Sequence, residues 1–170
     1  DIGANVGVFA IAARIAFPNS VIHCYEPNSD NTPHLNRLGK SLGLKTYKEA
    51  VSEIDGTCSL SKSTAHDTSA RISNLENGEI SMVSLGTVLN RFDSKELDLL
   101  KLDCEGSEFE ILKDSTNLRK CKFITLEYHI LEDQHLESLK TLLSNAGFQV
   151  IQMNKRNKTL GNILAKRNII

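Results

Sequence analysis

Charged side chains crowd the end of one apolar segment of the sequence. Leu97–Leu102 is typical of a buried strand, and Lys101, Asp103, Glu105 and Glu108 lie on it or directly after it. In open α/β folds, ligands bind at the carboxyl edge of the sheet, where these residues would meet. Carboxylates placed there can accept a proton, so we expect Asp103 and Glu105 to belong to a catalytic site. For Lys101, an ion pair with a neighbouring carboxylate is the alternative to a direct role in this site.

A histidine ends a second segment of the same kind. Cys121–His129 is typical of another buried strand, and its Glu127 and His129 are two residues apart. Side chains at that spacing share one face of a strand. Histidine has an unperturbed pKa of about 6.5 and exchanges protons near neutral pH. We therefore expect His129 to be a candidate general base, with a purely structural role as the alternative.

The chain opens on a turn that could bind a cofactor. Asp1, Gly3, Asn5 and Gly7 alternate with small or apolar residues, and the apolar helical segment 8–13 follows. Glycine lets the backbone approach a ligand closely, and the N–H groups that start a helix attract electron-rich groups. This pattern predicts a nucleotide-like cofactor. A plain connection between a strand and a helix is the alternative.

An acid follows the turn at a meaningful distance. Glu26 comes about 20 residues after the glycines, at the end of the apolar segment Val21–Tyr25, and Pro27 and Asn28 form a turn after it. Nucleotide-binding α/β domains place an acid there because its two carboxylate oxygens accept hydrogen bonds from the two ribose hydroxyls. We expect Glu26 to bind a ribose in this way.

Helices and strands alternate along the chain and position these residues. Repeated strand–helix units predict an α/β, doubly wound, mostly parallel sheet, and two final strands add an antiparallel hairpin. Ser52–Ser81 is rich in Ser, Thr, Asn and Asp and predicts a β-hairpin or irregular insertion, where we expect His66 and Asp67 to be solvated. The other predicted elements are helices over 6–16, 30–43 and 132–146 and strands over 21–25, 44–50, 97–103, 121–129, 148–153 and 160–165.

Composition limits the class of protein. The chain has 170 residues, 40% of them hydrophobic, and a net charge of −1. We therefore expect one globular domain over residues 1–170, with no nucleic-acid partner, no membrane span and a cytoplasmic location. Because the chain begins inside the glycine motif, we expect this domain to be N-terminally incomplete, with its first strand truncated.

The four cysteines lack the spacing of a zinc site. They are scattered singly along the chain, and three of them stand in or beside apolar segments. We expect these thiols to be reduced and to pack in the core. No metal is predicted from the cysteines. A metal in place of the general base would require the side chains of Asp103, Glu105, Glu127 and His129 to converge.

Five motifs together resemble one family. They are Asp-Ile-Gly-Ala-Asn-Val-Gly at 1–7, Tyr-Glu-Pro-Asn at 25–28, Glu-Ala-Val-Ser at 49–52, Leu-Lys-Leu-Asp-Cys-Glu-Gly-Ser-Glu at 100–108 and Glu-Tyr-His at 127–129. In this order the chain resembles the FkbM-type methyltransferases, which have the class I S-adenosylmethionine-dependent fold. The resemblance implies a seven-stranded Rossmann-like sheet. It also implies methyl transfer from S-adenosylmethionine to a hydroxyl of a small-molecule, sugar or glycan acceptor.

The resemblance assigns roles residue by residue. Asp1, Gly3, Asn5 and Gly7 would form the loop around the methionine part of the donor. Glu26 would bind the ribose, and Pro27 and Asn28 would flank the adenosine. Ala50 and Val51 would lie by the adenine, and Asp103 would stand beside the methionine moiety and the acceptor. Asn5 replaces the middle glycine of the broader class I pattern.

Two other functions remain open from the sequence. A nicotinamide-dependent oxidoreductase also needs a glycine turn and an acid, but its G-x-G-x-x-G fingerprint is not matched, since Gly3 and Gly7 are four residues apart. A non-catalytic S-adenosylmethionine-binding module would keep the turn and Glu26 without needing the cluster around Asp103. The sequence does not identify the acceptor or the oligomeric state.

Overall fold

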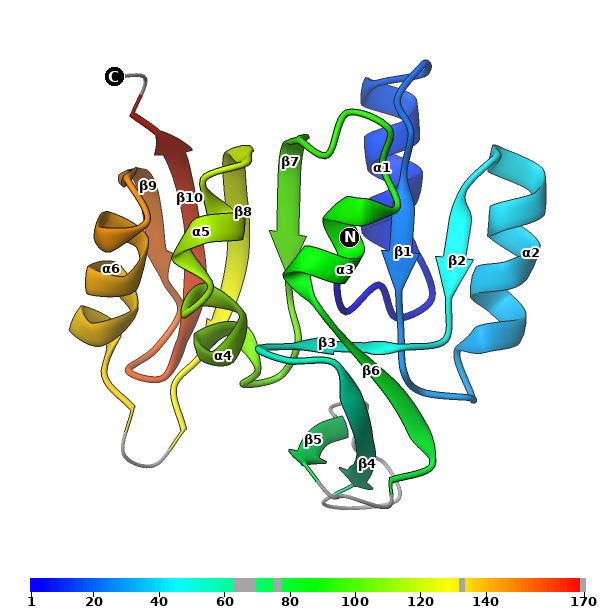
Figure 1. Cartoon of the computed structure of the whole chain (residues 1–170), viewed down its shortest axis with the longest axis horizontal. Helices are drawn as coiled ribbons and strands as arrows, with labels where there is room; N and C mark the ends of the chain where they lie inside the picture. The colour runs from blue at the N-terminus through cyan, green and yellow to red at the C-terminus, as the bar shows by residue number, and fades with distance from the viewer. Residues whose placement is uncertain (63–69, 75–77, 132–133, 169–170) are drawn as a thin grey trace. The chain divides into compact units, whose positions relative to one another are not determined.

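The chain forms two compact units, each with its own fold (Figure 1). The structure is a computed structural model that describes residues 1–62, 70–74, 78–131 and 134–168. Unit 1 comprises Asp1–Ala50 and Gly56–Met82. Unit 2 comprises Val51–Asp55 and Val83–Ile170.

Unit 1 begins with the glycine turn and two helix–strand pairs. Its elements are α1 (Val8–Ala16), β1 (His23–Tyr25), α2 (Thr32–Leu42) and β2 (Lys45–Tyr47). β1 and β2 pair in parallel, and Ile2 forms a parallel bridge with Tyr25 on β1. The segment before the glycine turn therefore lies alongside β1, as a strand that delivers a turn should. α2 ends as predicted at Gly43, which adopts φ 64°.

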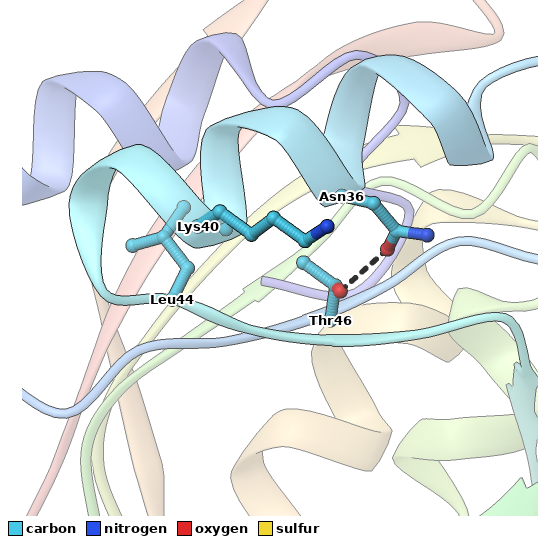
Figure 2. Close-up of a pocket in the computed structure, with 5 residues that line it drawn as sticks. Asn36, Lys40, Leu44 and Thr46 are labelled. Atoms are coloured by element: carbon cyan, nitrogen blue, oxygen red, sulfur yellow. Dashed lines mark hydrogen bonds between the residues drawn. The ribbon is translucent and has the colours of Figure 1, made fainter.

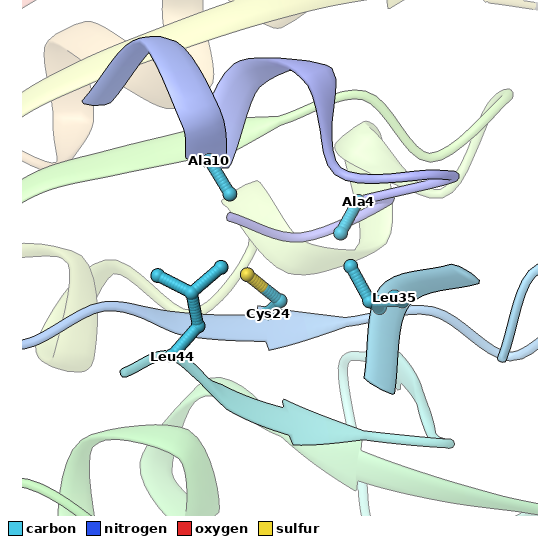
Figure 3. Packing of buried hydrophobic residues seen from close by; sticks show 5 residues of the cluster. All are labelled: Ala4, Ala10, Cys24, Leu35 and Leu44. Atoms are coloured by element: carbon cyan, nitrogen blue, oxygen red, sulfur yellow. The ribbon is translucent and has the colours of Figure 1, made fainter. Parts of the chain in front are cut away.

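Small and branched side chains hold the glycine turn on this framework. Figure 3 shows Ala4, Ala10, Cys24, Leu35 and Leu44 packed together, and all five are buried. They come from the turn, α1, β1, α2 and the start of the segment leading into β2. Cys24 is a fully buried thiol, so the prediction that it packs in the core is confirmed.

The predicted insertion is an antiparallel arrangement. β4 (Gly56–Lys62) pairs antiparallel with β5 (Ala70–Asn74) and, through Gly56–Cys58, with β6 (Ile80–Ser84). This confirms the predicted hairpin. His66 and Asp67 lie outside the described residues. The single strand predicted over 44–50 is instead β2 and the buried β3 (Ala50–Ser52), because Lys48 and Glu49 interrupt it.

Unit 2 contains a four-stranded mixed sheet. Its order is β7 (Leu97–Leu102), β8 (Cys121–His129), β10 (Leu160–Arg167) and β9 (Phe148–Lys155). β7 and β8 are parallel, whereas β10 runs antiparallel to both β8 and β9. The predicted C-terminal hairpin is thus confirmed. The helices of unit 2 are α3 (Leu85–Asn90), α4 (Glu108–Leu112), α5 (Ser115–Leu118) and α6 (Leu136–Asn145).

Strand β8 separates a core face from a polar face. Ile124, Leu126 and Tyr128 are buried, while the alternating residues Glu127 and His129 are half-buried. This alternation confirms that Glu127 and His129 share a face. The same face therefore presents both polar side chains at the carboxyl end of the strand.

The α/β class is confirmed, but the strand count is wrong. The described residues contain ten strands rather than seven, arranged in mixed sheets. The insertion contributes paired strands of its own, and the segment 44–52 forms two short strands. Within the described part of the chain, no helix is long and apolar enough to cross a membrane.

Gly161 gives a stability test of the unit 2 sheet. It lies opposite Tyr128 in the β10–β8 pair, and a Cβ there would run into the Tyr128 ring and the Asn154 carbonyl oxygen. Overpacking of this kind costs about 1–3 kcal/mol, so Gly161→Ala should lower the free energy of unfolding by that amount in urea titrations. Gly56→Ala is the control, because its Cβ would meet only Met82 Cε at 3.6 Å. Equal stability of the two variants would contradict this packing.

Candidate functional site

The glycine turn of unit 1 is shaped for close approach to a ligand. Gly3, Asn5 and Gly7 have φ values of 73°, 51° and 91°, which lie in the left-handed region. At Gly7 a Cβ would also lie 2.7 Å from Leu38 Cδ1, so the end of that leucine side chain would have to move. Asparagine tolerates this region better than most residues, which explains why Asn5 can replace a glycine. Within the described residues, no side chain caps the start of α1. Helix starts favour electron-rich or anionic groups.

Glu26 ties this turn to the one that follows β1. Its side chain is buried, and its Oε2 accepts the Asn5 N–H at 2.8 Å while Oε1 accepts the Asn28 N–H at 2.8 Å. Each carboxylate oxygen has two lone pairs, so each can accept one further hydrogen bond. The predicted ribose-binding acid and the glycine turn are therefore in direct contact.

The remaining predicted donor-binding residues differ in how far they are buried. Asp1 is half-buried, and its terminal amino group donates to the His23 carbonyl at 3.0 Å. Pro27 and Asn28 are half-buried beside Glu26, whereas Ala50 and Val51 are buried in β3. Ala50 belongs to unit 1 and Val51 to unit 2. Their roles toward the adenosine stay predictions.

The acidic segment after β7 forms a tight turn in unit 2. Glu105 and Gly106 have φ values of 54° and 111°, and α4 begins two residues later. Lys101 Nζ lies 3.4 Å from Asp103 Oδ2, so the ion pair considered as the alternative role for Lys101 is present. The turn leaves Asp103 and Glu105 half-buried at the end of the strand.

Glu108 holds that turn from inside. Its side chain is fully buried, and Oε1 accepts the Cys104 N–H at 2.7 Å while Oε2 accepts the Gly106 N–H at 2.9 Å. The sequence placed Glu108 among the acids of this run but did not select it as a site residue. Its position at the start of a helix, two residues after a glycine, is the signal that could have identified it.

His129 lies between two carboxylates. Its Nε2 is 3.3 Å from Glu105 Oε2, and its Nδ1 is 3.4 Å from Glu108 Oε1. Ligand atoms of Asp103, Glu105 and His129 all lie within 4.8 Å of one another. The structure thus brings together the three predicted catalytic residues.

Glu127 belongs to a different set of contacts. Its carboxylate pairs with Arg156 Nη1 at 2.9 Å and accepts a hydrogen bond from Asn162 Nδ2 at 3.2 Å. Both partners come from the C-terminal hairpin and its tip. Glu127 therefore shares a face with His129 without joining its cluster.

The cluster retains protons more strongly than its members would alone. Burial disfavours the charged imidazole, but the hydrogen bond to Glu108 and the charges of Glu108, Glu105 and Asp103 outweigh it and raise the pKa of His129. Burial and the neighbouring carboxylates also raise the pKa of Glu105, against the opposing effect of His129. Both groups therefore keep their protons to a higher pH than they would in isolation.

The same geometry would accommodate a divalent cation. Asp103, Glu105 and His129 each offer one ligand atom, and such oxygen and nitrogen donors suit several divalent metals. The sequence predicts no metal there.

A separate hollow on unit 1 contains none of the predicted site residues. Figure 2 shows it between α2 and β2, with a volume of about 250 Å³ and a lining of Asn36, Gly39, Lys40, Leu44 and Thr46. A hydrogen bond of 2.7 Å from Thr46 Oγ1 to Asn36 Oδ1 crosses it. We assign it no role in binding the donor.

Comparison with known families agrees with these motifs. Residues 1–150 match the Methyltransferase FkbM domain. The chain belongs to the FkbM methyltransferase family. This family membership implies S-adenosylmethionine as the methyl donor. No curated protein matches the chain.

Solved structures of methyltransferases share the fold of this FkbM chain. A precorrin-6y C5,15-methyltransferase from Geobacter metallireducens has a TM-score of 0.56 and 15% identity, over 99% of this chain and 78% of its own. A putative RNA methyltransferase from Pyrococcus horikoshii has a TM-score of 0.57 and 14% identity, over 99% of this chain and 72% of its own. A putative tRNA (m1A22) methyltransferase from Streptococcus pneumoniae has a TM-score of 0.57 and 10% identity, over 100% of this chain and 63% of its own. At these identities the likeness shows the fold alone.

The raised pKa of His129 is directly measurable. An NMR titration of the histidine ring should give a pKa above the ordinary 6.5, and Glu105→Gln should lower it by removing the charge 3.3 Å from Nε2. Since the folded pKa is raised, the associated stabilisation is present below pH 6.5 and is lost as the pH rises through the folded value. Glu110→Gln, on an outer carboxylate that pairs with Lys113, is the control. A pKa of His129 at or below 6.5 would contradict the contacts of its ring with Glu105 and Glu108.

Proposed function

We propose that residues 1–170 act as one methyltransferase domain that moves a methyl group from S-adenosylmethionine to a hydroxyl of a small-molecule, sugar or glycan acceptor. The observation that carries this proposal is the pairing of His129 with Glu105 and Glu108, because a hydroxyl acceptor needs a group that takes its proton. The net charge of −1 offers no general attraction to nucleic acid.

Unit 1 would bind the donor. The backbone of the turn formed by Asp1, Gly3, Asn5 and Gly7 would surround the methionine part, and the positive end of the α1 dipole would favour electron-rich groups there. Each oxygen of the Glu26 carboxylate already accepts one backbone N–H that holds a turn in place. The remaining lone pair on each oxygen would accept a hydrogen bond from a ribose hydroxyl. Pro27, Asn28 and Ala50 of the same unit would border the adenosine.

His129 would act as the general base. When bound, S-adenosylmethionine would supply the methyl group: the acceptor oxygen would gain an O–C bond as the C–S bond breaks, and the donor would leave as the neutral thioether. The hydroxyl proton passes to Nε2 of His129, next to Glu105. Such proton transfer contributes about 10²- to 10⁴-fold to a rate. Asp103, which follows the neighbouring parallel strand β7, would orient the acceptor or assist this transfer.

Donor binding can be tested at Glu26. Glu26→Gln removes a charged hydrogen-bond acceptor, each such bond being worth about 1.5–3 kcal/mol, so the calorimetric Kd for S-adenosylmethionine should rise about 10- to 100-fold. Glu79→Gln, an exposed carboxylate of the same unit, should leave the Kd unchanged. Circular dichroism checks that Glu26→Gln remains folded, because this side chain also holds two backbone N–H groups. Equal affinity of the two variants would remove the ribose assignment.

Catalysis can be tested at His129. His129→Ala should reduce turnover about 10²- to 10⁴-fold while S-adenosylmethionine binds as before, since the ring acts on the acceptor proton. Mass spectrometry would follow the gain of CH₂ on a panel of sugar, glycolipid and polyketide alcohols. Turnover near that of the wild type would exclude His129 as the base.

A further inference from the structure

We propose that Glu108 is a positioning residue for His129, which fixes a hydrogen on Nδ1 and presents Nε2 toward Glu105 and Asp103. Glu108 touches neither donor nor acceptor in this account and would act only through the ring. The consequence for catalysis rests on the proposed function, because it makes Nε2 the atom that receives the acceptor proton. The orientation of the ring itself is a property of the chain without any ligand.

Glu108 is unusually constrained for a carboxylate. Its side chain has no exposed surface, and both of its oxygens accept backbone N–H groups, from Cys104 at 2.7 Å and Gly106 at 2.9 Å. It therefore has no freedom to follow the histidine. The ring must instead adapt to the carboxylate, whose Oε1 lies 3.4 Å from Nδ1.

The two carboxylates make unequal demands on the ring. A carboxylate only accepts hydrogen bonds, so a ring nitrogen that faces one is favoured when it carries hydrogen. A neutral imidazole has one N–H for two such neighbours. The side chain of Glu105 is 35% exposed and can be solvated, whereas that of Glu108 is 0% exposed. The single hydrogen therefore belongs on Nδ1, and the lone pair on Nε2.

A role confined to the turn is the competing explanation for Glu108. The Cys104 and Gly106 N–H groups alone would account for its burial, and the distance to His129 would then be incidental. That explanation sets no preference between the two ring nitrogens. The tautomer of His129 therefore separates the two accounts, because which nitrogen carries hydrogen depends on the hydrogen bonds of the ring.

The experiment records two-bond ¹⁵N–¹H correlations of the histidine rings in the full chain. The protein is labelled at histidine and dialysed against a chelator, and the His129 signals are assigned by their loss in His129→Gln. Above the pKa of His129, the neutral ring should carry its hydrogen on Nδ1. A ring protonated mainly on Nε2 would overturn the proposal. This measurement needs no variant of Glu108.

Glu108→Gln provides the second arm. Removing the buried charge should lower the pKa of His129 by a shift that Glu110→Gln does not produce, and an equal pKa in the two variants would overturn the proposal. If Glu108→Gln does not fold, the tautomer of the wild-type ring decides. Calorimetry with S-adenosylmethionine on the same wild-type sample keeps the proposals apart. Loss of donor binding would contradict the proposed function and leave the Nδ1 assignment standing.

Discussion

A buried carboxylate that accepts two backbone N–H groups holds the candidate binding turn in each unit. Glu26 does so for the glycine turn of unit 1, and Glu108 for the turn after β7 in unit 2. Both turns contain residues in the left-handed region, which few side chains adopt without help. A buried carboxylate can stabilise such a turn, because charge-assisted hydrogen bonds are roughly twice as strong as neutral ones. The positions of the other site residues depend on these two anchors.

The two anchors lead to different chemistry. Glu26 retains lone pairs for hydroxyl donors, which suits recognition of a sugar ring. Glu108 faces an imidazole, whose opposite nitrogen meets Glu105. The excess of carboxylates around His129 favours the bound proton, which fits a group that must take a proton from an alcohol. Carboxylates near a sulfonium would mainly strengthen donor binding, because the positive charge disperses during transfer.

Much of this arrangement follows from the sequence because it is local. The spacing between the glycines and Glu26 predicts that both serve one cofactor, and the structure places them in contact. The two-residue spacing of Glu127 and His129 predicts their shared face. The alternation of apolar segments predicts the α/β class and the final hairpin. These features depend on periodicity and on short stretches of chain, which a sequence displays directly.

The parts that the sequence did not predict depend on contacts between distant residues. Asp103, Glu105 and Glu108 are acids of one short run, and their residue types alone do not show that Glu108 is the buried one. Glu127 pairs with Arg156, 29 residues away on the hairpin tip, rather than with the cluster. The division of the segment 44–52 into the two short strands β2 and β3 likewise has no clear signal in the residue types.

The most direct test of the central claim is the thermal stability of the full chain with S-adenosylhomocysteine and, separately, with NAD. A ligand that binds only the folded state stabilises it by mass action, so the account predicts a higher Tm with S-adenosylhomocysteine and no change with NAD. Both ligands contain a ribose that Glu26 could bind. A response to only one of them would therefore report on more than ribose binding. A rise in Tm with NAD alone would contradict the account.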